Sequence, residues 1–227
     1  MPENHEIDFS NVKFYHQAPA PWELHGEGII LVYKFSKEWV ENHGHLPNYL
    51  KGKFRGGLGY VMLVNYEKSP VGPYHELLII PGKFRKSRKQ AITKIYVDSP
   101  ASTQNGRANW GIPKQTLPFE WEKNGSKDLI RIKDGNKTVF SCDVKAWGIP
   151  IPTSTSLFPI DLDQTWNKVH FLTKPSGSGR AKLAKIENMV VDPDYFPDIS
   201  KLRPLLAVKI NPFHITFPEP LYGDKLV

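Results

Sequence analysis

The most informative stretch of the sequence reads Gly106-Arg107-Ala108-Asn109-Trp110-Gly111-Ile112-Pro113-Lys114. Two glycines and a proline predict an irregular backbone here, and Trp110 and Ile112 place bulky apolar groups just before the lysine. A lysine in such a site loses hydration, and this desolvation lowers the pKa of its amine from about 10.4. A neutral amine can attack a ketone to form an imine, whose protonated form accepts electrons from a breaking bond. Composition alone favours the alternative of an ordinary surface lysine in a loop.

A second stretch, Gly72-Pro73-Tyr74-His75-Glu76-Leu77-Leu78-Ile79-Ile80, places a carboxylate at the start of an apolar strand. Strand alternation puts Tyr74 and Glu76 on one face and His75 on the other. Taken alone, the stretch fits an exposed acid at a strand end as well as a functional one.

Together the two stretches resemble the acetoacetate decarboxylase family. That family has a tyrosine–x–glutamate at a strand start, then a glycine–arginine followed at a fixed distance by a proline and the imine-forming lysine. Here Tyr74-His75-Glu76, Gly106-Arg107 and Pro113-Lys114 stand at the family's separations without a gap. Tyr96-Val97-Asp98 looks like the strand that leads into the glycine–arginine.

The resemblance implies a mainly β fold, an acetoacetate decarboxylase-like β-barrel with a few short helices and an enclosed apolar pocket. It also implies that Lys114 forms the Schiff base, a role that desolvation or a cationic neighbour activates in acetoacetate decarboxylase itself. Glu76 falls on one of the family's two active-site acids and is expected to help in proton transfer. Family members assemble into homo-oligomers, so we expect one here. The protonated imine is the electron sink, so no metal or organic cofactor is expected.

The expected substrate contacts come from Tyr74, Trp110, Val61 and Arg107, and Arg107 is also expected to order the loop that carries the lysine. Val61 takes the place of the family's other acid.

Two further positions depart from the family. The residue after the nucleophile is Gln115 instead of a second lysine, and the family's arginine near its first strand falls near Gly26 or His25. A bidentate arginine contact is a strong and directional way to hold a carboxylate. We therefore expect acetoacetate itself to be a poor substrate.

These residues leave three functions open. The leading hypothesis is a decarboxylase-like carbon–carbon lyase that forms a Schiff base between Lys114 and a small keto acid or ketone. The second is an aldolase–dehydratase acting on a keto acid and an aldehyde. The third is a non-catalytic protein that binds an apolar ligand; Val61 and Gln115 favour it, whereas the family spacing from Glu76 to Lys114 argues against it.

Short strands separated by turns are predicted throughout, because 20 prolines and 17 glycines punctuate the chain. Strands are expected at Gly28–Phe35, Tyr60–Tyr66, Glu76–Ile80, Thr93–Asp98, Phe119–Lys123, Leu129–Lys133, Thr138–Val144, Lys168–Leu172, Lys182–Val191 and Leu206–Phe217. Asp134-Gly135-Asn136 predicts a hairpin turn. Helical turns are expected after Ser36, ending before Gly44, and at Asp161–Trp166. Pro175–Gly179 predicts a loop, and residues 1–227 are expected to form one domain.

Composition and charge exclude several classes of protein. Thirty Lys and Arg against 23 Asp and Glu give a formal net charge of +7, which favours anionic partners. No helix-turn-helix, zinc-finger or RNA-binding pattern accompanies the basic residues, so no nucleic-acid partner is expected. The basic run Lys83–Lys89 predicts an exposed, mobile loop, with capture of an anionic substrate as the alternative.

Membrane, secreted and metal-binding classes are also disfavoured. The apolar runs are far shorter than the ~20 residues of a membrane span, and Met1–Glu6 lacks the order of a signal peptide. Cys142 is the single cysteine, which excludes an intramolecular disulfide framework. His25, His43 and His45 have no third ligand at a fixed spacing, so no metal is expected. These features predict a cytoplasmic protein.

Overall fold

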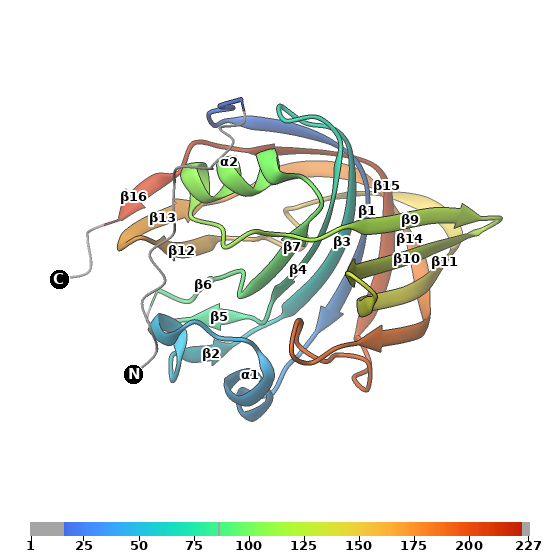
Figure 1. Cartoon of the computed structure of the whole chain (residues 1–227), viewed down its shortest axis with the longest axis horizontal. Helices are drawn as coiled ribbons and strands as arrows, with labels where there is room; N and C mark the ends of the chain where they lie inside the picture. Colours follow the sequence, from blue (N-terminus) through green and yellow to red (C-terminus); the bar gives the residue numbers. More distant parts are fainter. Residues whose placement is uncertain (1–15, 86, 224–227) are drawn as a thin grey trace.

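Two sheets dominate the computed structural model, which describes residues 16–85 and 87–223 (Figure 1). The larger sheet has, in spatial order, β8 (Gln115–Thr116), β7 (Lys94–Val97), β4 (Tyr74–Ile80), β3 (Gly59–Lys68), β1 (Trp22–Tyr33), β15 (Leu206–Phe217), β14 (Ser176–Val191), β11 (Lys137–Ser154), β10 (Lys127–Asp134) and β9 (Phe119–Asn124). The smaller sheet has β16 (Leu221–Gly223), β13 (Val169–Thr173), β12 (Leu162–Trp166), β6 (Lys89–Gln90), β5 (Lys83–Phe84) and β2 (Phe54–Gly56).

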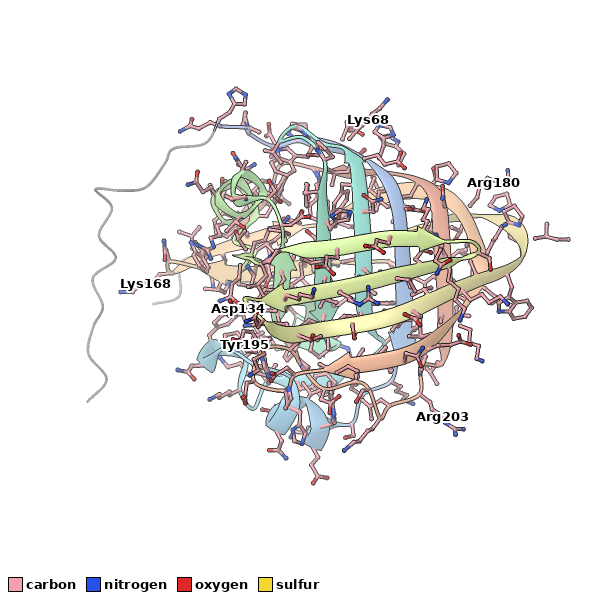
Figure 2. All side chains as sticks on the ribbon, turned by 45° about the vertical axis from the view of Figure 1, so that its right-hand side comes forward. Lys68, Asp134, Lys168, Arg180, Tyr195 and Arg203 are labelled. Atoms are coloured by element: carbon pink, nitrogen blue, oxygen red, sulfur yellow. The ribbon has the colours of Figure 1, made fainter. Side chains whose placement is uncertain are left out.

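The large sheet curls over on itself, as the family resemblance implied. Figure 2 shows strands β9, β10 and β11 running across the middle strands of the same sheet. The odd-numbered residues of β3 and β4, including Val61 and Ile79, pack with Ile130 and Phe140 in the core between these layers. The even-numbered residues face the opposite side, towards the smaller sheet. The prediction of a mainly β, barrel-like fold is confirmed.

All ten predicted strands are present, and several are longer than predicted. The Asp134-Gly135-Asn136 turn joins β10 to β11 as expected, with Gly135 at φ 55°. The expectation of a loop at Pro175–Gly179 is wrong, because β14 already begins at Ser176. A Cβ on Gly177 would lie 2.4 Å from the carbonyl oxygen of His214, so glycine permits the close pairing with β15 here.

The predicted helix after Ser36 is confirmed as α1 (Lys37–His43), where the Ser36 hydroxyl accepts a hydrogen bond from the backbone N–H of Trp39. The expectation of a helical turn at Asp161–Trp166 is wrong. These residues contain β12, which pairs with β13 across a tight turn at Asn167 and Lys168. Both turn residues have positive φ, as this kind of hairpin requires.

The longest helix, α2 (Pro100–Trp110), replaces the irregular backbone expected around Gly106. Ser99 caps its first turn and Pro100 occupies the first helical position, both common at helix starts. Gly111 ends it in the left-handed conformation, with φ 62°. The remaining helical segment is the short 3₁₀ turn η2 (Asn48–Leu50). Among the described residues, no helix is long and apolar enough to cross a membrane.

The two ends of the basic run lie in β5 and β6 of the smaller sheet, whereas Ser87 and Arg88 are exposed turn residues. The Nη1 atom of Arg85 lies 2.7 Å from both carboxylate oxygens of Asp163, and Lys89 Nζ lies 2.6 Å from Asp161 Oδ1. The expectation of free, exposed cations is therefore wrong for Arg85 and Lys89. Lys86 lies outside the described residues.

Candidate active site

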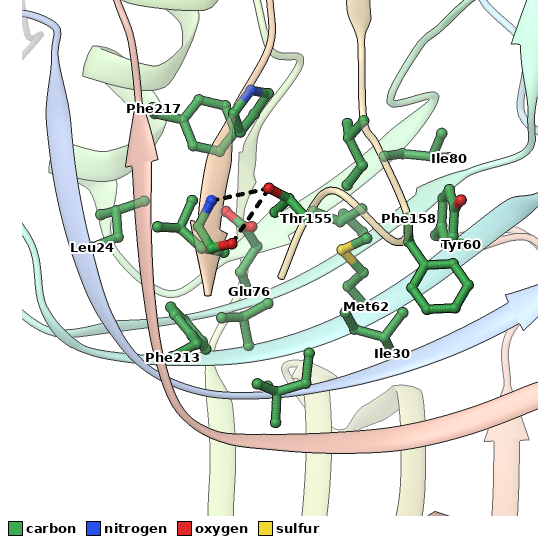
Figure 3. A pocket seen from close by; sticks show the side chains of 18 of the residues that line it. Leu24, Ile30, Tyr60, Met62, Glu76, Ile80, Thr155, Phe158, Phe213 and Phe217 are labelled. Carbon is green, nitrogen blue, oxygen red and sulfur yellow. Dashed lines mark hydrogen bonds between the residues drawn. The ribbon is translucent and has the colours of Figure 1, made fainter. Parts of the chain in front are cut away.

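A cavity of about 190 Å³ lies between the large sheet on one side and α2 with the smaller sheet on the other (Figure 3). Its wall consists mainly of even-numbered residues of β1, β3, β4 and β15, which alternation points away from the other core. The segment 153–162, which joins β11 to β12, closes another side. Most of the lining side chains are aliphatic or aromatic, and hydroxyl groups come from the tyrosines and from Thr153, Ser154, Thr155 and Ser178.

Lys114 and Glu76 meet in the wall of this cavity. Their side chains are each 5% exposed, and Lys114 Nζ lies 2.8 Å from Glu76 Oε2. The same ammonium donates to the Ser102 hydroxyl at 2.9 Å and to the Tyr74 hydroxyl at 3.5 Å. The Tyr66 hydroxyl donates to the other carboxylate oxygen of Glu76 at 3.1 Å. Both charges are therefore held by specific partners.

The glycine–arginine pair in α2 positions the lysine. A Cβ on Gly106 would lie 2.8 Å from Lys114 Cδ and 2.9 Å from Cε, so the lysine stem can pass the helix only where a side chain is missing. Arg107 Nε donates to the backbone carbonyl of Lys114 at 2.9 Å, and its guanidinium lies over the Trp166 ring. The helix thus fixes both the backbone and the side-chain path of Lys114.

The pKa of Lys114 differs in direction from the sequence-based expectation. Burial lowers the pKa of the amine, but the Glu76 carboxylate and the Tyr74 hydroxyl together raise it by more, so it lies above its ordinary value. The sequence-based prediction of a lowered pKa took account of desolvation alone and not of the paired Glu76 carboxylate. Burial also raises the pKa of Tyr74, to about 12, and that of Tyr66, so both groups stay protonated phenols.

Two of the predicted substrate contacts, Tyr74 and Trp110, line the cavity. Tyr74 lies beside Lys114, and the Trp110 indole, which is 2% exposed, donates to the carbonyl of Pro218. His75 lies on the opposite face, where its ring stacks on Trp121, as alternation predicted. These three placements follow directly from the strand and helix that carry them.

Val61 and Arg107 do not line the cavity, so its geometry gives no support to the predicted substrate contacts of these two residues. Val61 pairs with Ile79 and packs into the opposite core, because an odd position of β3 faces away from the even position of Glu76 on β4. Met62 is the β3 neighbour that faces the cavity. Arg107 contacts the backbone carbonyl of Lys114 and the Trp166 ring.

The remaining departures from the family pattern also lie away from the cavity. Gln115 is exposed on β8, where its side-chain oxygen accepts a hydrogen bond from Lys94. The ring of His25 stacks on His214, and Gly26 packs against the backbone of Asn65. Neither His25 nor Gly26 lines the cavity, and no arginine does so among the described residues.

Sequence reasoning missed Ser102, which contacts Lys114, and Tyr66, which contacts Glu76. Ser102 lies on the helix that was not predicted, so nothing placed it near Lys114. Tyr66 pairs with Tyr74 across β3 and β4, a register that strand alternation alone does not give. Within residues 16–85 and 87–223, no three His, Cys, Asp or Glu side chains are grouped so that they could hold a metal ion.

The fold and the site define a class of β proteins in which a curled sheet encloses an apolar cavity with one buried lysine–glutamate pair. The chain belongs to the acetoacetate decarboxylase family, whose model, described as "Acetoacetate decarboxylase (ADC)", matches residues 10–195. This confirms the family resemblance noted in the sequence. None of the curated proteins compared with the chain by sequence matches it.

Solved structures share this fold at low sequence identity. Acetoacetate decarboxylase from Legionella pneumophila is 13% identical, with a TM-score of 0.70, over 97% of this chain and 94% of that one. The enduracididine biosynthesis enzyme MppR, complexed with pyruvate, is 15% identical, with a TM-score of 0.65, over 92% of each chain. An acetoacetate decarboxylase-like enzyme from Sphingomonas wittichii RW1 is 11% identical, with a TM-score of 0.63, over 92% of this chain and 95% of that one. The prediction of an enzyme is confirmed at the level of the family.

Proposed function

We propose that the protein is a Schiff-base carbon–carbon lyase in which Lys114 attacks the carbonyl carbon of a keto acid or ketone. The buried Lys114–Glu76 pair carries this proposal, since no other cavity-lining residue of the described chain is charged. A buried ion pair seldom adds net stability, because both charges lose hydration. An isolated pair of this kind in an apolar cavity is better explained by chemistry than by folding.

The first step is a proton transfer. Lys114 rests as an ammonium, and Glu76 Oε2, at 2.8 Å, is within reach to accept its proton. The neutral amine then adds to the substrate carbonyl carbon. The nitrogen–carbon bond forms, the carbonyl oxygen leaves as water with the proton that Glu76 gives back, and a protonated imine remains beside the Glu76 carboxylate.

The second step breaks the carbon–carbon bond. When a carboxylate is attached to the carbon next to the imine, it leaves as carbon dioxide and its bonding electrons pass into the imine, giving an enamine. A proton taken from solvent is passed through Glu76 to the enamine carbon, and water then hydrolyses the resulting imine to release product and regenerate Lys114. Tyr74, Tyr66 and Ser102 hold the two reacting groups in place.

An aldolase–dehydratase uses the same kind of enamine to form a carbon–carbon bond instead of breaking one. The enamine carbon attacks an aldehyde, and the adduct then loses water. MppR supports this alternative, since that enzyme, 15% identical to this chain, is known complexed with the condensation product of pyruvate and imidazole 4-carboxaldehyde. Product analysis with and without an added aldehyde separates the two reactions.

Assembly into a homo-oligomer is also part of the proposal. Trp147, Ile149 and Ile151 on β11 are 55%, 83% and 66% exposed, a concentration of apolar surface on one strand that a second copy could cover.

Borohydride trapping tests the proposed function. The protein is incubated with a panel of keto acids and ketones, reduced, digested and analysed by mass spectrometry. We expect one stable adduct, on Lys114, and none in Lys114→Ala or Lys114→Arg, since a guanidinium is never neutral in the working range.

Lys209 is an internal control for this experiment. It is also largely buried and paired with a carboxylate, Glu27, but it does not line the cavity. Adducts spread equally over Lys209 and surface lysines, or no adduct on Lys114 with any carbonyl compound, would contradict the proposal and favour a non-catalytic binding protein.

A further inference from the structure

The strand register arranges the cavity wall in rows that run across the large sheet. The first row contains the acid, and its members are Glu76, Val64, Gly28 and Ile210. The second row contains Leu78, Met62, Ile30 and Val208. The third row contains Ile80, Tyr60, Val32 and Leu206. All of these residues line the cavity, so one continuous wall leads away from the reacting pair.

The two further rows are apolar apart from one hydroxyl, that of Tyr60. Successive rows are two residues apart along each strand, or roughly 6.6–6.8 Å, so this wall extends about 13 Å beyond Glu76. Figure 3 shows Glu76 near the centre of the lining, with Ile30, Met62, Phe158, Ile80 and Tyr60 gathered to one side of it. An acetoacetate-sized molecule bound at Lys114 would leave this side uncovered.

The volume of the cavity agrees with a larger occupant. At about 190 Å³ it exceeds the roughly 150 Å³ of an apolar protein cavity that holds benzene. Gly28 contributes to this space, since a Cβ there would meet neighbours only at 3.5 Å or more and the position has room for a side chain that is missing.

The charges of the cavity disfavour a substrate held by its carboxylate. The Lys114 ammonium is already paired with Glu76, and no second cation lines the cavity among the described residues. A carboxylate placed in this wall would lose hydration without gaining a cationic partner. An alkyl group would gain affinity instead, by about fourfold for each methylene buried.

We propose that the substrate carries an apolar tail on its carbonyl carbon, and that this tail lies along the second and third rows while the carbonyl reaches Lys114. The proposal rests on the proposed Schiff-base function and narrows its substrate class. The tail, and not a carboxylate, supplies most of the binding free energy.

Trapping with a series of neutral methyl ketones tests this proposal. Acetone, methyl propyl ketone and methyl hexyl ketone are each titrated with cyanoborohydride present, and the adduct on Lys114 is quantified. We expect the half-saturating concentration to fall at least 100-fold from acetone to methyl hexyl ketone. We expect acetoacetate to resemble acetone.

Two matched variants locate the tail. Met62→Phe fills the second row and should reduce the preference for methyl hexyl ketone over acetone at least tenfold. Met189→Phe makes the same change at a partly buried residue that packs against the opposite core, and it should leave the preference unchanged. An equal loss of preference in both variants would overturn the assignment of the tail to these rows.

A probe without a carbonyl separates this inference from the proposed function. Methyl hexyl carbinol cannot form an imine, but it should raise the melting temperature and compete with the ketone. If ketones are trapped on Lys114 without dependence on chain length, the tail proposal is wrong and the Schiff-base function stands. If the carbinol binds but no ketone is trapped, the Schiff-base function fails, and with it the claim that the tail belongs to a substrate. A carbinol that does not bind overturns the apolar site itself.

Discussion

Removing Lys114 alone should destabilise the protein more than removing Lys114 and Glu76 together. At 2.8 Å the two charges attract by about 6 kcal/mol for an effective dielectric constant of about 20. Each charge also loses several kcal/mol of hydration on burial, so the pair is close to neutral in its net effect on folding. Lys114→Met leaves the Glu76 carboxylate 5% exposed with the Tyr66 hydroxyl beside it, and should cost about 3–5 kcal/mol.

The double variant Lys114→Met, Glu76→Leu replaces both charges with apolar side chains of similar size. Its free energy of unfolding should lie within about 1 kcal/mol of the wild-type value, or above it by up to about 4 kcal/mol. Urea titrations of the wild type, both single variants and the double variant give these free energies, provided that the slope m is the same for all four. A double variant less stable than both single variants would show that the pair stabilises the fold, and would refute the inference that the pair serves chemistry.

Three other perturbations have outcomes set by the same geometry. Gly106→Ala should displace the Lys114 stem and slow trapping by roughly 100-fold, as a small misplacement of a reacting group does; a folded variant that traps at the wild-type rate would contradict the role of this glycine. Because Glu76 raises the pKa of Lys114 and burial lowers it, Glu76→Gln should move the rising limb of the pH–trapping curve to lower pH, whereas a shift to higher pH would mean that the carboxylate is not the dominant neighbour. Cys142 is 1% exposed and burial raises the pKa of its thiol, so iodoacetamide at pH 8 should label it only after unfolding in urea, and rapid labelling of the native protein would show that the core opens.

Strands were predictable because their signal is local. Alternating β-branched and apolar residues marked every one of the ten predicted strands. Helix α2 was not predictable in this way, because it has no apolar stripe: apart from Gly106 and Trp110 its buried residues are polar, and of these Ser102 contacts Lys114 and Asn105 contacts Ala18. Ser99 and Pro100 are both common at helix starts and are visible in the sequence. Gly106, however, favours an irregular backbone when it is read alone, whereas in the structure its missing side chain leaves room for the Lys114 stem.

The site was predictable where one motif carries both residue and role. Family spacing singled out Lys114 and Glu76, and the structure places them in contact. Val61 was placed wrongly because its position depends on the register of β3 against β4, where Val64 and not Val61 pairs with Glu76. A shift of one residue exchanges the two faces of a strand, so a one-position difference in alignment moves a side chain from the cavity into the opposite core.

Different rows of the sheet carry the reaction and the contacts with the rest of the cavity, and this separation has a consequence for how the enzyme can evolve. The reacting groups are Glu76 in the first row and Lys114, which follows α2, whereas the residues of the second and third rows belong to other positions of the same strands. The backbone hydrogen bonds of the sheet do not depend on which apolar side chain occupies those positions. A substitution there therefore leaves Lys114 and Glu76 in place. New substrates can therefore be acquired by single substitutions on an unchanged framework, which is how one fold comes to host several reactions.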